Sequence, residues 1–165
     1  MRIRTTILVF ILLIAVNGLG QDNKWRVHPE LGCTWSDNFF AEAGIMRSWT
    51  GSKEGDPLAL MGYKLAVVSN FNNNHFIVGP KISAEVDLLF ISVRANVTDY
   101  ICSGINDIRV TPEAGLTLLG FVTLCVGYNA PLLDTRINGI SNVELSLNIN
   151  LNRAYFDMFK TGDKS

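Results

Sequence analysis

Residues 143–152 alternate strictly between large aliphatic and polar side chains, reading Val-Glu-Leu-Ser-Leu-Asn-Ile-Asn-Leu-Asn. Because successive side chains of a strand point to opposite faces, this period of two predicts a strand with one apolar and one polar face. A helix would scatter the same residues around its whole surface. The pattern recurs along the chain and predicts an all-β fold.

The same alternation predicts seven further strands ahead of this one. They are expected at 25–35, 39–49, 58–70, 76–87, 90–101, 108–118 and 121–132. Polar and turn-forming residues separate them, which predicts turns at 36–38 and 72–74 and loops at 50–57, 102–107 and 134–142. About eight consecutive strands with short connections predict one antiparallel up-and-down β-barrel.

Three of the expected strands contain a proline, namely Pro29, Pro80 and Pro112. Each proline sits in a similar short phrase near the start of a hairpin. Proline has no N–H to donate to a strand ladder and is therefore confined to edges and bulges. We expect bulges or barrel-rim positions at all three.

The first 20 residues have a different character. Arg2 and Arg4 precede an apolar run over 7–16 and a small-residue site at 18–20, which predicts a secretory signal peptide cleaved before Gln21. The apolar run is shorter than the about 20 residues that a membrane helix needs, which argues against an anchor.

The chain after this signal is expected to form a barrel domain over 21–156 and a frayed tail over 157–165. A net charge of −1 argues against a nucleic-acid partner, which requires a basic face. The three cysteines are widely spaced, so no disulfide framework, metal site or cofactor is expected, although one disulfide stays open.

Alternation alone leaves open which face is inside. A lipocalin-like barrel puts apolar side chains inside, whereas a membrane barrel turns them toward lipid. The apolar face here carries no charge at mid-strand, since Arg47 and Asp99 break the pattern only near strand ends. Charged residues make up 18% of the chain, below the roughly 25% of typical soluble domains, which also favours lipid.

The polar face carries charges of both signs, and an eight-stranded barrel is just wide enough for side chains to fill it. We therefore predict an ion-pair network in the lumen, formed by Arg26, Glu30, Glu42, Lys64, Lys81, Glu85, Asp87, Arg94, Arg109, Glu113 and Glu144.

Aromatic residues gather near the predicted strand ends, as in the interfacial girdles of membrane barrels. They are Trp25, Trp35, Phe39, Trp49, Phe76, Phe90, Tyr100, Phe121, Tyr128, Tyr155 and Phe156.

Over about 25–155 the chain resembles the small eight-stranded outer-membrane β-barrel proteins of Gram-negative bacteria, in particular the family common in Bacteroidota. The resemblance is carried by the signal peptide, the strand meander, the phrases at 109–116 and 127–132, and the closing strand. It implies an outer-membrane location and assembly by the insertion machinery. One departure is the C-terminus, which ends Asp163-Lys164-Ser165 in place of an aromatic residue.

His28 is the main candidate for chemistry, because some small outer-membrane barrels are lipid-modifying enzymes that use a histidine. This use would require a hydroxyl at hydrogen-bond distance from His28, from Ser48, Ser83 or Ser146. The simpler interpretation, a histidine within the lumen network, is favoured, and His75 is expected in a loop.

Two other groups admit a functional alternative. Glu42 and Glu113 could act as paired acids, but pairing with Arg94 or Arg109 is favoured. Asn72–Asn74 could bind a cation or a glycan, but an ordinary turn is favoured.

The sequence thus predicts a monomeric, non-catalytic barrel in the outer-membrane bilayer, with a plugged polar lumen and a structural, adhesive or envelope-stabilising role. The alternatives are a diffusive pore, a soluble periplasmic lipocalin-like binder of an apolar ligand, and a lipid-modifying enzyme.

Overall fold

The computed structural model describes residues 25–53, 56–70, 76–118 and 120–151 of the 165-residue chain. The predicted signal peptide, the turn at 72–74, His75 and the tail from 157 lie outside these residues, as do the two boundaries of the predicted barrel domain.

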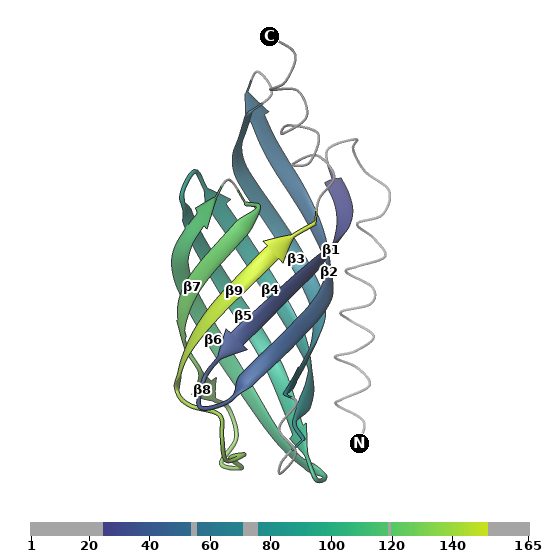
Figure 1. Ribbon diagram of the computed structural model, residues 1–165, viewed down its shortest axis with the longest axis vertical. Helices are drawn as coiled ribbons and strands as arrows, with labels where there is room; N and C mark the ends of the chain where they lie inside the picture. The colour runs from purple at the N-terminus through teal and green to yellow at the C-terminus, as the bar shows by residue number, and fades with distance from the viewer. Residues whose placement is uncertain (1–24, 54–55, 71–75, 119, 152–165) are drawn as a thin grey trace.

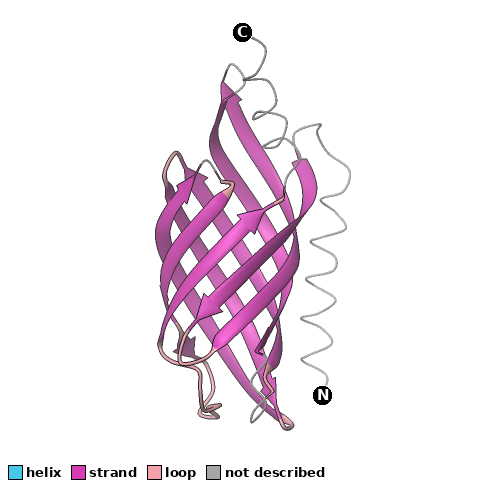
Figure 2. Cartoon of the chain, viewed as in Figure 1, coloured by secondary structure: helices cyan, strands magenta, loops and turns pink. Residues whose placement is uncertain are grey.

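The described residues form strands joined by turns and loops (Figure 2). The strands are β1 Trp25–Trp35, β2 Phe39–Lys53, β3 Asp56–Asn70, β4 Val78–Leu88, β5 Ile91–Cys102, β6 Ile105–Leu118, β7 Val122–Tyr128, β8 Ala130–Pro131 and β9 Val143–Asn150. No helix in the described part of the chain is long and apolar enough to cross a membrane.

The strands close into an antiparallel barrel (Figure 1). Each strand from β1 to β6 pairs with the next along the chain, and β9 pairs with both β7 and β1, which closes the barrel. Strands β7 and β8 both pair with β6 in one continuous register, so together they form one of the eight strands of the barrel. The predicted all-β, eight-stranded, up-and-down barrel is therefore confirmed.

Two predicted loops are in fact strand. Strand β2 continues to Lys53 and β3 begins at Asp56, so most of 50–57 belongs to a long hairpin. Only Ser103 and Gly104 separate β5 from β6, with φ of 48° and 83°. Positive φ at both central positions is the geometry of the tight type I′ hairpin, which Gly104 adopts without steric cost. The polar residues of these two segments therefore extend the ladder.

The three prolines interrupt hydrogen bonding without shifting the register. Pro29 lies one residue before the β1–β9 ladder begins. The β4–β5 ladder skips 79–80, and the ladder of β6 with β7 and β8 skips 111–112, with the same register on both sides of each gap. The expected bulges at Pro80 and Pro112 are therefore wrong, because loss of one donor breaks single rungs only.

The apolar faces point outward and the polar faces point inward. In β9, Val143, Leu145, Leu147 and Ile149 are 38–58% exposed, whereas Glu144 between them is 3% exposed. The other strands follow the same rule, so the lumen is lined by charged, amide and hydroxyl groups. The predicted orientation of the two faces is confirmed.

Small apolar clusters lie near each end of the lumen. At the end that carries the long β8–β9 loop, residues 132–142, the cluster contains Phe40, Val68, Ile77, Tyr100, Ile137 and Ile140. At the other end, which carries Trp25 and Leu151, Met46 and Leu60 pack with Phe121. Tyr100 and Phe121, predicted as girdle aromatics, belong instead to these clusters.

Glycines on the inner face make room for the charged side chains. A Cβ at Gly127 would lie 2.7 Å from Cγ of Glu113 and 2.8 Å from Cγ2 of Thr111. A Cβ at Gly44 would lie 2.6 Å from the Leu65 carbonyl oxygen and 2.7 Å from the Ala66 Cβ. All four distances are shorter than an ordinary van der Waals contact, so the lumen has no space for larger residues at Gly44 and Gly127.

We expect Gly44→Val to lower the free energy of unfolding by about 1–3 kcal/mol, because the lumen is overpacked by the new side chain. Urea unfolding of the folded protein in detergent, followed by tryptophan fluorescence, measures the change. Ala43→Val is the matched control, because Ala43 is adjacent in β2 and faces outward. Equal stability of the two variants would contradict the inner-face packing.

Candidate functional site

The described lumen holds seven buried carboxyl residues and four buried cations. The carboxyls are Glu30, Glu42, Glu85, Asp87, Asp107, Glu113 and Glu144, and the cations are Lys64, Lys81, Arg94 and Arg109. A buried charge is costly unless it is paired and hydrogen-bonded, so the partners of these groups decide how the lumen is built.

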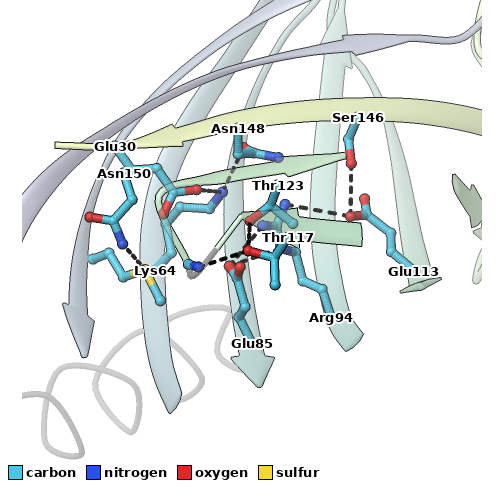
Figure 3. A network of polar contacts seen from close by, with 12 residues as sticks. Glu30, Lys64, Glu85, Arg94, Glu113, Thr117, Thr123, Ser146, Asn148 and Asn150 are labelled. Atoms are coloured by element: carbon cyan, nitrogen blue, oxygen red, sulfur yellow. Dashed lines mark hydrogen bonds and ion pairs between the residues drawn. The ribbon is translucent and has the colours of Figure 1, made fainter. Parts of the chain in front are cut away.

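Lys64 is the centre of the first group of contacts. Its Nζ lies 2.7 Å from Oε1 of Glu30 and 2.5 Å from Oε1 of Glu42, and donates a 3.2 Å hydrogen bond to Oδ1 of Asn148. Lys81 shares Glu42, with Nζ 2.8 Å from Oε2. Through Lys64, strand β3 is tied to β1, β2 and β9, so this ammonium bridges the seam at which the barrel closes (Figure 3).

Arg94 is the centre of the second group. Its Nη2 lies 2.8 Å from Oε2 of Glu85, and its Nη1 lies 3.5 Å from Oε2 of Glu113. Glu113 also accepts hydrogen bonds from Asn96 at 2.7 Å and from Ser146 at 3.0 Å. These side chains come from β4, β5, β6 and β9, and they converge in the middle of the lumen (Figure 3).

Arg109 and Asp107 form a third group that holds the β8–β9 loop. Oδ2 of Asp107 accepts hydrogen bonds from Nη2 of Arg109 at 2.8 Å and from the backbone N–H of Ile137 at 3.0 Å. Nη1 of Arg109 donates to the carbonyls of Ile140 at 3.1 Å and Ser141 at 3.2 Å. The loop is therefore fixed across the lumen, with Ile137 and Ile140 in the apolar cluster.

Most of the predicted network is brought together. Eight of the eleven predicted residues make ion pairs: Glu30, Glu42, Lys64, Lys81, Glu85, Arg94, Arg109 and Glu113. Arg26 is exposed, because it is the second residue of β1 and lies where the strand leaves the lumen. It was predicted as a lumen residue and stands outside the network.

The predicted network omits Asp107, which was expected in a loop but belongs to β6. It also missed Asn96, Ser146 and Asn148, which extend the ion pairs by hydrogen bonds. All four share the inward face with the charged residues of their strands, so the alternation contained the signal. The prediction considered only the charged side chains of the expected strands, which left out Asp107 in the expected loop and the three uncharged residues.

Asp87 and Glu144 are buried but make no ion pair within the described part of the chain. Asp87 faces Ser92 across β4 and β5, without a hydrogen bond of regular geometry to either carboxylate oxygen. Glu144 and Glu113 flank Gly127 from the two neighbouring strands. Among the described buried carboxyl groups, these two are the ones without a cation at ion-pair distance.

His28 is buried, and neither ring nitrogen has a hydrogen-bond partner among the described residues. Within the same part of the chain the hydroxyls of Ser48 and Ser83 are also without partners, while Ser146 donates to Glu113. The structure thus places His28 in the lumen but brings it into hydrogen-bond contact with none of the three candidate serines.

Metal ligands are not gathered either. Among the described residues there is no group of three or more His, Cys, Asp or Glu side chains that could hold a metal ion. Cys33, Cys102 and Cys125 are all free, so the one disulfide left open by the sequence is not formed.

Comparison with known proteins adds one partial similarity. A 128-residue stretch is 27% identical to the subtilisin-like proteases SBT3.5 and SBT3.3 of Arabidopsis thaliana, and it covers 77% of this chain but 15% of each protease. No protein-family model matches the chain, and no solved structure matches it. Because the chain spans so little of the proteases, their activity is not transferred to it.

Glu42→Gln is expected to lower the free energy of unfolding by about 3–5 kcal/mol, because it leaves the buried Lys64 and Lys81 without their shared counter-charge. Urea unfolding in detergent measures the loss. Arg26→Gln removes an exposed charge and is expected to change stability by about 0.5 kcal/mol or less. Similar effects of the two variants would argue against the Lys64 network.

Arg109→Gln is expected to release the β8–β9 loop, because it removes charge-assisted hydrogen bonds worth about 2 kcal/mol. Trypsin cleavage after Arg136, which is exposed in this loop, should then accelerate about tenfold or more. Asp107→Asn should act in the same direction, whereas Arg26→Gln should not. Unchanged cleavage in both loop variants would show that these two side chains do not hold the loop.

Proposed function

We propose that the protein is an integral β-barrel of a Gram-negative outer membrane, with a structural, adhesive or envelope-stabilising role and a plugged polar lumen. In this proposal it is made with a cleaved signal peptide, is assembled by the outer-membrane insertion machinery as a monomer, and belongs with the small barrels common in Bacteroidota. The observation that carries the proposal is the aliphatic outer surface around an ion-paired interior.

The outer surface is apolar around the barrel. Exposed aliphatic side chains on it include Val27, Leu31, Ile45, Leu65, Val67, Val86, Val93, Val97, Leu116, Leu124, Val126, Leu145 and Leu147. Soluble monomers rarely expose contiguous apolar patches larger than a few hundred Å². A surface of this kind is stable where the surrounding medium is hydrocarbon.

Exposed aromatic residues lie near both ends of the strands. Trp35, Phe39, Phe76 and Tyr128 lie toward the end with the β8–β9 loop, and Tyr63 and Phe90 lie toward the end with Trp25. Two such girdles mark the two interfaces of a membrane barrel. Membrane barrels have short periplasmic turns and longer outer loops, so the β8–β9 loop end would face outward.

Closure of the sheet supports the same proposal. In hydrocarbon, each unpaired backbone N–H or C=O costs several kcal/mol, so only helices and closed barrels span a bilayer. The β1–β9 pairing over Glu30–Trp35 leaves the sheet without an open side. A soluble sheet does not need this closure.

The alternatives each need a feature that the lumen does not offer. A lipocalin-like binder needs an apolar interior, whereas Lys64, Arg94 and their carboxylate partners occupy this one. A diffusive pore needs an open path, which the apolar cluster around Phe40 and the fixed loop obstruct. A lipid-modifying enzyme built on His28 needs a hydroxyl partner, and none is hydrogen-bonded to it.

Leu147→Lys separates a membrane barrel from a soluble one. In a bilayer, a lysine near the middle of β9 on the lipid face is expected to cost about 2–4 kcal/mol. In water, replacing an exposed leucine would change stability by about 0.5 kcal/mol or less. Leu133→Lys is the control, because Leu133 is exposed in the β8–β9 loop. Unfolding in lipid vesicles measures both.

Two measurements on the wild-type protein accompany this variant. Carbonate-washed membranes should retain the protein, and unheated protein should migrate differently from boiled protein on a detergent gel. Release by carbonate together with a neutral Leu147→Lys would overturn the membrane assignment.

A further inference from the structure

Arg47 is a cation on the largely apolar outer surface of the described strands. At strand positions with described side chains, Arg47 and Asp99 are the charged residues that face outward. Both oxygens of Asp99 accept hydrogen bonds from the Asn106 amide, at 3.0 and 3.1 Å. Within the described part of the chain, no carboxylate lies within ion-pair distance of Arg47.

Aromatic rings hold Arg47 in place. In the register of the sheet, Arg47 lies between Val27 of β1 and Tyr63 of β3. Its guanidinium carbon is 5.1 Å from the centre of the Trp25 ring, and Trp25 stacks on Tyr63 with ring centres 6.5 Å apart and an interplanar angle of 11°. A guanidinium attracted to a ring face has no hydrogen-bond acceptor there. The N–H groups along its edge remain available to an acceptor.

The position of this group selects the kind of acceptor. Trp25 is the first residue of β1 and pairs with Trp49, and Arg47 lies two residues along β2 from Trp49, level with Tyr63, at the end opposite the β8–β9 loop. At that depth in a bilayer the hydrocarbon meets the lipid headgroups. The acceptor found there is the phosphodiester, whose oxygens match the guanidinium edge in bidentate geometry.

We propose that Arg47, Trp25 and Tyr63 form a binding site for the phosphodiester of a phospholipid headgroup. The site rests on the proposed membrane function, since a lipid reaches it only if the outer surface faces a bilayer. Arg47 donates to the phosphate oxygens, the Trp25 ring lies against the guanidinium, and the exposed phenol of Tyr63 offers a further donor. The acyl chains then lie on the aliphatic rows next to Val27 and Leu65.

Lipid retention by the folded full chain tests this site. The protein in detergent is titrated with phosphatidylglycerol, and the bound lipid is counted by native mass spectrometry. Diacylglycerol with the same acyl chains lacks the phosphate, and glycerophosphate lacks the chains; neither should be retained. Arg47→Gln should weaken phosphatidylglycerol retention about tenfold, the loss typical of one charge-assisted bidentate pair.

Two further variants keep the test decisive. Arg47→Lys keeps the charge but loses the bidentate edge, so its retention should fall between those of wild type and Arg47→Gln. Asp99→Asn changes the other outward-facing charge and should retain phosphatidylglycerol as the wild type does. Gel migration of unheated samples confirms that each variant is folded, and if Arg47→Gln does not fold, Arg47→Lys against wild type decides.

Equal retention in wild type, Arg47→Gln and Arg47→Lys would overturn the site. So would equal retention of phosphatidylglycerol and diacylglycerol, which would indicate acyl-chain contact alone. If the protein is retained by carbonate-washed membranes and its gel migration changes on boiling, either outcome would reject only the lipid site. The proposal of a membrane barrel would then stand. Release by carbonate with a neutral Leu147→Lys would remove the membrane barrel and the lipid site together.

Discussion

The structure depends on one constraint, the free-energy cost of burying charged side chains inside a narrow barrel. Lys64 illustrates the constraint: its ammonium is 1% exposed, and it is stable there because carboxylates from β1 and β2 and an amide from β9 reach it at once. Such contacts exist only if the barrel is closed and the register is correct, since a shift of one residue would turn every inner side chain outward. The ion pairs therefore define the register as well as stabilising the fold.

The outer surface and the lumen impose opposite demands on the same strands. Each strand offers aliphatic groups outside and pairing groups inside, and the inner Gly127 leaves the volume that the Glu113 side chain occupies. At one end, Arg109 and Asp107 hold the β8–β9 loop in place across the lumen, with Ile137 and Ile140 inside it. These features together support the proposal of a rigid, closed membrane barrel.

Much of the fold could be read from the period of two. It predicted the strand positions, the meander and the eight ion-paired residues, because alternation directly encodes which side chains share a face. The alternation failed where strand pairing decides the local structure. Residues 102–107 form a tight hairpin, and Pro80 and Pro112 lie within regular strands. Arg26 lies on the inward side of its strand but at the mouth of the tube, and depth along a strand is not written in its periodicity.

The sequence by itself determined the all-β class, the two faces of each strand and the set of residues available for the lumen, because these depend on local alternation. Only the tertiary structure decided the partners. Arg109 pairs with Asp107 of its own strand and with loop carbonyls, Glu42 joins two lysines, and among the described residues Asp87 and Glu144 make no ion pair. Partner choice follows from strand register and tilt around the closed barrel, which bring residues distant in the chain to the same level, and no local pattern contains that information.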